Sequence, residues 1–291
     1  MAANPFAALF DETTLVRLRK LRLASGRVQR GGARGERLSR QFGSGQEFGT
    51  HRPYAHGDDL RRVDWNVYGR LDQLVLKLFE QPGQLRVLLV ADDAPTMDFG
   101  AVSKWLAARR LLAAVGLIAL AGSERVQAGC LSGGPVETFD GTGEDRLLEW
   151  FTRLAPLAAT DGAALRSLLQ SRGRDTVLVL ASDFQRREPA LELLQEARRR
   201  GARAMAISIS CTEETRPTLH GLTRLQPIGA DGIRLRVDER VLAAYHDELT
   251  RWREGTAKAV RALGAAFMEF DSGQPIEPLV REMLRAGLVR A

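Results

Sequence analysis

The pattern of apolar and polar positions changes near residue 85. From Arg86 onward, short apolar runs typical of strands alternate with amphipathic stretches typical of helices. The expected strands cover residues 86–91, 125–130, 135–139, 176–181, 203–209 and 265–270. Because these runs are apolar along almost their whole length, we expect helices on both faces of a mostly parallel sheet. The pattern therefore predicts a doubly wound α/β domain over residues 85–291.

Between the strands, apolar residues recur at helical spacing. The expected helices are centred on residues 15–21, 147–154, 165–169, 191–197, 242–263 and 276–283. Asp11–Thr14 provides a polar start for the first of them. One departure from the alternation lies at about residues 212–237, which predict an inserted β-hairpin with Asp231-Gly232 as its turn.

The chain before residue 85 is less regular and more basic. Residues 26–49 are rich in Gly and Arg and have little periodicity, so we interpret them as loop. The positive charge gathers on Arg17, Arg19, Lys20, Arg22, Arg27, Arg30, Arg34, Arg37 and Arg40. We therefore divide the chain into a basic N-terminal helix and loop at residues 1–41, a segment at 42–84 packed on the core, and the sheet domain at 85–291.

Composition places the chain among folded globular proteins. It has 291 residues, a formal net charge of +6 and two cysteines without Cys-x-x-Cys spacing. Buried, reduced thiols are the expected state of Cys130 and Cys211, which suits a reducing compartment. The N-terminus does not resemble a signal peptide, and the longest apolar run, residues 111–121, is too short to span a bilayer. We expect a cytoplasmic protein.

Oxygen-bearing side chains follow several of the expected strands, where open α/β sheets bind ligands. They are Asp92, Asp93 and Thr96 after the first strand of the domain, Ser182 and Asp183 after residues 176–181, and Thr160 at the start of a helix. Hydroxyl and carboxylate oxygens are the ligands that Mg²⁺ prefers. The same residue types also cap helices, and on spacing alone capping is the commoner role.

Asp92-x-Ala94-x-Thr96 resembles the Asp-x-Ser-x-Ser motif of von Willebrand factor A-type domains. The resemblance implies a metal-ion-dependent adhesion site in which Asp92, Thr96, Thr160 and Asp183 hold Mg²⁺, or Mn²⁺ or Ca²⁺, while Asp93 and Ser182 contact a partner. Ala94 stands where the motif has a ligand serine, so the expected site is degenerate. The alternative is the same surface recognising its partner without a metal.

Upstream, residues 43–81 resemble the signature of a bacterial family, domain of unknown function 58, and the resemblance extends over about residues 40–270. The matching residues are Gly43, Gly45, Glu47, Phe48, Arg52, Tyr54, Gly57, Asp58, Arg61, Asp64, Trp65, Arg70, Lys77, Phe79 and Glu80. Residues 59–65 are expected to form a short helix capped by Asp58, with Trp65 and Tyr68 anchoring it to the sheet domain. Two roles remain open for this signature, a structural clasp or a docking surface formed by Arg52, Asp58, Arg61, Asp64 and Trp65.

The resemblance implies a non-enzymatic interaction module, an adaptor or chaperone-like partner of a MoxR-type AAA+ ATPase, which recognises partners near Asp92 and Asp183. A nucleic-acid-binding protein that uses residues 17–40 is the main alternative, but that segment lacks aromatic residues for base stacking. A metal-dependent hydrolase is disfavoured because the four histidines are scattered without metal-ligand spacing. The sequence also lacks a phosphate-binding Gly-x-x-x-x-Gly-Lys loop.

Overall fold

The computed structural model describes residues 8–18, 41–43, 47–53, 65–71, 75–81, 85–155, 169, 176–225 and 232–285. The chain divides into two compact units. One consists of residues 1–31 and 85–291, and the other of residues 32–84. The larger unit is built on a six-stranded sheet in the order β11-β8-β7-β4-β5-β6.

The strands of the large sheet confirm the apolar runs of the sequence within two residues. They are β4 Arg86–Ala91, β5 Arg125–Cys130, β6 Gly133–Phe139, β7 Thr176–Ser182, β8 Arg203–Ser210 and β11 Ala266–Asp271. All neighbours pair in parallel except β5 and β6, which are antiparallel. The expected mostly parallel, doubly wound α/β sheet is therefore confirmed.

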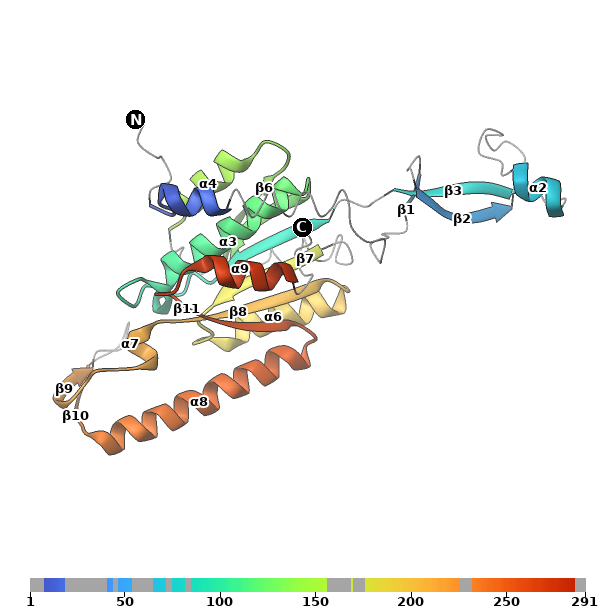
Figure 1. Ribbon diagram of the computed structural model, residues 1–291. Helices are drawn as coiled ribbons and strands as arrows, with labels where there is room; N and C mark the ends of the chain where they lie inside the picture. Colours follow the sequence, from blue (N-terminus) through green and yellow to red (C-terminus); the bar gives the residue numbers. More distant parts are fainter. Residues whose placement is uncertain are drawn as a thin grey trace. The chain divides into compact units, whose positions relative to one another are not determined.

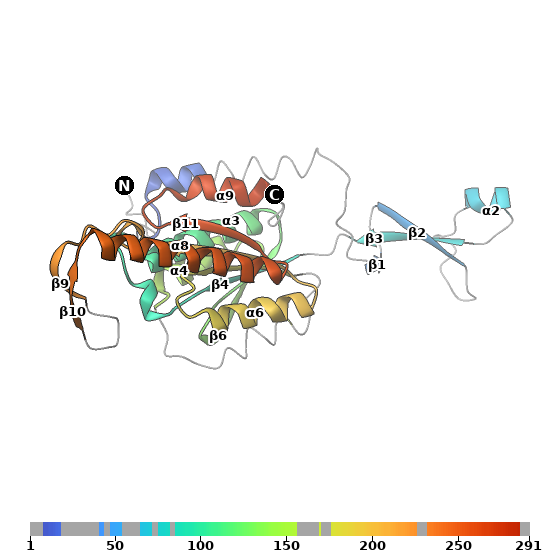
Figure 2. The same ribbon diagram turned by 90° about the horizontal axis from the view of Figure 1, so that it is seen from below.

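Helices cover both faces of this sheet (Figure 1). The helix at residues 12–18, α3 Lys104–Ala121, α4 Glu144–Arg153 and α9 Ile276–Arg285 lie on one face, and α6 Arg187–Arg199 and α8 Glu239–Ala262 lie on the other (Figure 2). Alternate residues of β4 enter different cores, since Leu89 packs with the first group of helices and Leu88 with the second. A central strand buried on both sides must be apolar throughout, as β4 is.

Helix α3 is the central helix that the sequence pattern did not predict. Its residues show no polar face because the sheet lies beneath it and α4, α9 and the N-terminal segment surround it. Ser103 caps its start, since the Leu106 N–H donates to Ser103 Oγ at 3.2 Å. The Arg110 side chain, half-buried on this helix, donates to the Leu9 carbonyl and ties the N-terminal segment to it.

The inserted hairpin is confirmed, whereas its predicted turn at Asp231-Gly232 falls on a connection that lies mostly outside the described residues. The short helix α7 Thr212–Thr215 leads into β9 Gly221–Leu225, which pairs antiparallel with β10 Ile233–Val237. Leu225 pairs with Ile233 at the open end of the described ladder, and residues 226–231 lie outside the described part of the chain.

The smaller unit contains a three-stranded antiparallel sheet in the order β1-β3-β2, with β1 Gln41–Gly43, β2 Glu47–Pro53 and β3 Val75–Gln81. The prediction of loop through residue 49 is wrong, because pairing with β3 orders Gly-rich sequence that has low strand propensity alone. Helix α2 spans Trp65–Leu71, so it begins where the predicted helix at 59–65 ends. Residues 54–64 lie outside the described part of the chain.

Candidate functional site

The candidate site lies at the carboxyl edge of the large sheet. Strands β4 and β7 are parallel neighbours with Ala91 opposite Ala181, so Asp92 and Ser182 leave the sheet side by side. The Asp92 N–H donates to the Ala181 carbonyl at 2.8 Å, which extends the pairing by one residue. Parallel register therefore brings together two loops that are separated by about ninety residues of sequence.

Asp92 connects these two loops from within the protein. Its Oδ1 accepts the Ala94 N–H at 3.0 Å, and its Oδ2 accepts the Ser182 hydroxyl at 2.5 Å. Ser182 Oγ in turn accepts the Phe184 N–H at 2.8 Å. Burial raises the pKa of the Asp92 carboxyl, although these hydrogen bonds favour the ionised form.

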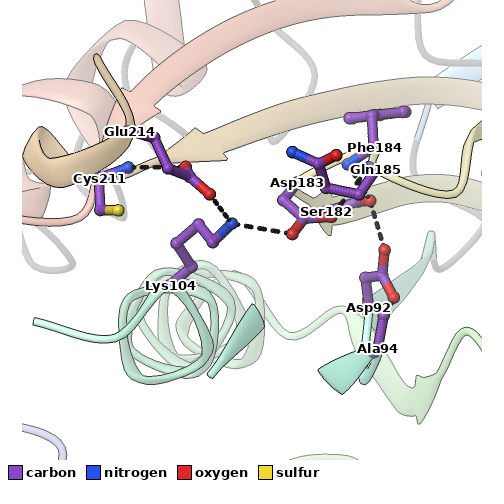
Figure 3. Close-up of polar contacts among 9 residues, drawn as sticks. All are labelled: Asp92, Ala94, Lys104, Ser182, Asp183, Phe184, Gln185, Cys211 and Glu214. Carbon is purple, nitrogen blue, oxygen red and sulfur yellow. Dashed lines mark hydrogen bonds and ion pairs between the residues drawn. The ribbon is translucent and has the colours of Figure 1, made fainter. Parts of the chain in front are cut away.

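Asp183 is held by a lysine that comes from a different part of the chain (Figure 3). Lys104 Nζ, in the first turn of α3, lies 2.9 Å from Asp183 Oδ2 and also contacts Glu214 Oε1. Only 1% of the Lys104 side chain is exposed. Burial alone lowers the pKa of Lys104, but attraction to Asp183 and the hydrogen bonds to Glu214 and Asp183 together raise it above its usual value. The two carboxylates therefore favour the charged form of this buried side chain.

The same network reaches the hairpin insertion. The Cys211 N–H donates to Glu214 Oε2 at 3.3 Å, and the Tyr245 hydroxyl on α8 donates to the Glu214 carbonyl at 2.7 Å. Lys104 therefore joins α3, the loop after β7, and α7. Glu214 therefore links the candidate site to the base of the hairpin.

Both cysteines are free and buried, as the sequence predicted. Burial raises the pKa of each thiol to about 12, and the nearby carboxylates of Asp93 for Cys130 and Glu214 for Cys211 act in the same direction. Because the thiolate is the reactive form, neither cysteine is suited to nucleophilic chemistry near neutral pH.

The two residues predicted to contact a partner here, Asp93 and Ser182, both lie inside the protein. Asp93 Oδ1 accepts the Ser132 N–H at 3.0 Å, and its other oxygen accepts the Ser132 hydroxyl. Asp93 thus connects β4 to the turn between β5 and β6. The contacts of Asp93 are thus with the protein's own backbone and Ser132. The predicted role of Asp93 in partner binding stays a prediction.

The described members of the predicted metal site do not fit a divalent cation at Asp183. Lys104 Nζ already lies 2.9 Å from Asp183 Oδ2. A metal ion bound to the same oxygen would lie next to the ammonium, and two neighbouring cations repel each other strongly in a buried site. Thr96 lies in the 3-10 turn η2, Pro95–Met97, where its buried hydroxyl has no hydrogen-bond partner among the described residues. Thr160 lies outside the described residues. Within the described ranges, no group of three or more His, Cys, Asp or Glu residues is arranged to hold a metal.

The upstream residues are only partly described. Arg52 lies in β2, whereas Asp58, Arg61 and Asp64 lie outside the described residues. Trp65 begins α2, is 59% exposed, and meets Tyr68 edge-on with ring centroids 6.1 Å apart. Whether this signature acts as a clasp or a docking surface stays a prediction.

Sequence reasoning missed Lys104 and its exposed neighbour Phe99. Lys104 is one of four lysines in a chain with 42 basic residues, and it stands directly before an apolar stretch, which is the signal that could have drawn attention to it. Phe99 is 44% exposed, and Lys104 Nζ lies 5.9 Å from its ring centroid. The edge therefore combines buried charges with an exposed aromatic ring.

Fold and site together define an α/β protein whose mostly parallel sheet has an internally ion-paired carboxyl edge. Residues 50–254 match the family described as "Protein of unknown function DUF58", so the chain belongs to that family and the predicted resemblance to it is confirmed. Among the part of the chain that the structure describes, no helix has both the length and the apolar character needed to cross a membrane.

Similar proteins include the uncharacterized proteins Rv1480 of Mycobacterium tuberculosis and Mb1516 of Mycobacterium bovis. Each is 33% identical over 90 residues, which cover 31% of this chain and 28% of the relative. The match thus spans about a quarter of the length of these relatives. The crystal structure of the conserved hypothetical protein BatB from Bacteroides thetaiotaomicron aligns with a TM-score of 0.44 and 12% identity, over 71% of this chain and all of that one.

Proposed function

We propose that this protein is a non-enzymatic interaction module that presents the carboxyl edge of its sheet to a protein partner and needs no metal ion to do so. The observation that carries the proposal is the buried contact between Lys104, Asp183 and Glu214. In a metal-dependent adhesion site a divalent cation balances the acidic residues. Here the ammonium of the chain itself supplies that positive charge.

The division between buried and exposed groups supports a binding role over a chemical one. Asp92 and Asp183 are almost fully buried, so their carboxylates do not reach a substrate at the surface. Phe99 is exposed, with its ring near the Lys104 ammonium, and its carbonyl accepts the Lys104 N–H at 3.1 Å. An exposed aromatic ring on a rigid support is typical of the residues that anchor protein–protein interfaces.

The partner class rests on the sequence resemblance, which implies a MoxR-type AAA+ ATPase. There are two alternative functions. No structural observation supports nucleic-acid binding by the arginine-rich segment at residues 17–40, because nearly all of that segment lies outside the described residues. Hydrolysis is opposed by the burial of Asp92 and Asp183 and by the ammonium on Asp183. We therefore propose the adaptor function over these two alternatives.

The experiment captures proteins from native lysate on the immobilised full-length chain, with a slowly hydrolysed ATP analogue and Mg²⁺ for the ATPase. We expect mass spectrometry to identify an AAA+ ATPase that the parent retains and Phe99→Ala loses. Val16→Ala is the matched control, because Val16 is 46% exposed on the N-terminal helix and Phe99 is 44% exposed.

Two outcomes would contradict the proposal. One is that the parent retains no AAA+ ATPase, and the other is that Phe99→Ala and Val16→Ala retain it equally. Metal independence is tested on the parent and on Asp183→Asn, by titration with Mn²⁺ followed by electron paramagnetic resonance. A stoichiometric site that Asp183→Asn removes would show that the edge does bind a metal.

A further inference from the structure

One face of the hairpin insertion carries three arginines and one apolar residue. Successive residues of a strand point to opposite faces, and the register places Arg224 opposite Arg234 and Leu222 opposite Arg236. All four side chains are exposed; on the other face Leu225, Leu235 and Val237 are at least partly buried, while Ile233 is exposed. We call the surface formed by Leu222, Arg224, Arg234 and Arg236 the arginine face.

This arrangement works against the stability of the hairpin. Like charges directly opposite each other across an antiparallel pair are destabilising, and Arg224 and Arg234 form such a pair. Among the described residues, none of the three guanidinium groups has an ion-pair partner. A two-stranded hairpin is only marginally stable by itself, so the repulsion between the arginines destabilises an element that is already weak.

The hairpin is also connected to the candidate site. It leaves the sheet through α7, directly after the carboxyl end of β8, and therefore projects from the same edge as Asp92 and Asp183 (Figure 1). Glu214 in α7 contacts Lys104, and Tyr245 at the start of α8 holds the Glu214 carbonyl. The base of the hairpin is thus fixed to the network that organises the edge.

We propose that the arginine face docks an acidic segment of the protein partner. The proposal rests on the interaction function argued above and adds the chemistry of what is recognised. Guanidinium groups bind carboxylates through paired N–H donors, and an acidic segment would relieve the repulsion between Arg224 and Arg234. Leu222, which is 79% exposed beside Arg236, offers an apolar contact that suits a peptide side chain. Proteins that bind single-stranded nucleic acids typically add aromatic rings on which the bases stack, and neither β9 nor β10 contains one.

The test uses Arg224→Glu in the full-length chain. This substitution replaces a repulsive cross-strand pair by an attractive one, so the hairpin is stabilised while the face loses most of its positive charge. Arg146→Glu on α4 is the matched control, because Arg146 is also exposed and its reversal changes the net charge of the chain equally. Loss of binding by the first variant alone therefore reports on the arginine face and not on total charge or folding.

The probe is a short fluorescent peptide that alternates Glu and Leu, and its anisotropy is followed as protein is added. We expect the parent and Arg146→Glu to bind it, Arg224→Glu to bind about tenfold more weakly, and added salt to weaken binding by the parent. Bound peptide should also slow hydrogen exchange of the β9 and β10 amides, because it stabilises the hairpin.

Three results would overturn the proposal: no binding by the parent at low salt, equal weakening in both variants, or tighter binding of single-stranded oligothymidylate than of the peptide. Phe99→Ala should bind the peptide as the parent does. Failure of the ATPase capture with intact peptide binding would therefore count against the proposed function, while the reverse pattern would count against the arginine face.

Discussion

At the scale of single residues, the structure depends most on Lys104. Its ammonium contacts Asp183 and Glu214 in the interior, at the junction of a helix, a strand end and the base of the hairpin. Removing charges from water costs several kcal/mol for each ion, so such a group is stable only when all of its members are present. The network is therefore better suited to fixing one conformation of the edge than to adding net stability.

Replacing Lys104 by methionine tests this role. Lys104→Met keeps most of the side-chain volume but leaves Asp183 buried without its cation, and we expect a loss of about 3–5 kcal/mol in the free energy of unfolding. Urea denaturation of the parent and the variant measures the loss. Lys104→Met/Asp183→Asn should recover part of it, because the second change removes the uncompensated charge. A loss below about 1 kcal/mol, the value typical of surface pairs, would show that the pair is effectively solvated.

Asp92 gives a prediction about pH. Burial raises the pKa of its carboxyl in the folded state above the ordinary value of 3.8, so the folded protein binds this proton more tightly than the unfolded chain does. Asp92 therefore stabilises the fold least when it is ionised. Its contribution to the free energy of unfolding falls as pH rises from 3.8 through the raised pKa of the folded protein. We expect the difference in Tm between Asp92→Asn and the parent to shift in favour of the variant over this window, as measured by calorimetry. A constant difference would contradict the raised pKa.

At the scale of elements, the packing of α3 explains both the architecture and the limit of pattern analysis. Most residues of α3 are buried, because the sheet, α4, α9 and the N-terminal segment surround it. Gly116 allows the closest approach, since a Cβ atom there would lie 2.6 Å from Leu147 Cδ2 and 3.0 Å from Leu89 Cδ1. The absence of one methyl group thus sets the distance between the central helix, α4 and the sheet.

The same substitution at two helical glycines should have opposite effects. Gly116→Ala gains helix propensity but overpacks a rigid core, which typically costs about 1–3 kcal/mol, so we expect a net loss of stability. Gly255→Ala on α8 meets only Arg187 Nη1 at 3.8 Å, so it should gain up to about 1 kcal/mol from propensity alone. Thermal or urea unfolding of both variants measures the two shifts. Stabilisation by both would mean that the core around Gly116 adjusts freely.

At the scale of the whole molecule, the N-terminal segment belongs to the sheet unit although fifty residues of the other unit separate them in sequence. Leu9, Phe10, Leu15 and Leu18 lie in the same core as α3 and α9. Arg17 adds an exposed ion pair to Glu277 on α9 at 3.7 Å, which contributes little by itself. The large unit is therefore completed by residues from both ends of the chain.

A chain limited to residues 85–291 should consequently be much less stable than the full chain. Each of the four buried N-terminal side chains contributes about 1.5–3 kcal/mol by leaving water, so the loss is expected to reach several kcal/mol. Urea denaturation compares the two chains. In the full chain, Leu18→Ala should reproduce about 2–5 kcal/mol of the loss, whereas Val16→Ala, at an exposed position on the same helix, should change stability little. Equal stability of the long and short chains would show that residues 85–291 fold independently.

The sequence by itself determined the features that depend on short-range pattern. Strands buried on both faces read as apolar runs, so β4, β7 and β8 were located from the sequence within two residues. Because parallel strands end at one edge, the sequence also predicted that Asp92 and Asp183 would lie near each other. The hairpin insertion was predicted from its position in the sequence, whereas its register is a property of the paired strands β9 and β10.

Only the tertiary structure decided what those side chains contact. Lys104 lies 79 residues from Asp183 and 110 residues from Glu214, and no local pattern marks contacts between residues so far apart. Helix α3 lacks an amphipathic period because neighbours surround it, and the smaller sheet forms from Gly-rich sequence because β3 pairs with it. Local propensity and periodicity describe which side of an element meets water, whereas the partners of a buried charge depend on how distant elements are brought together.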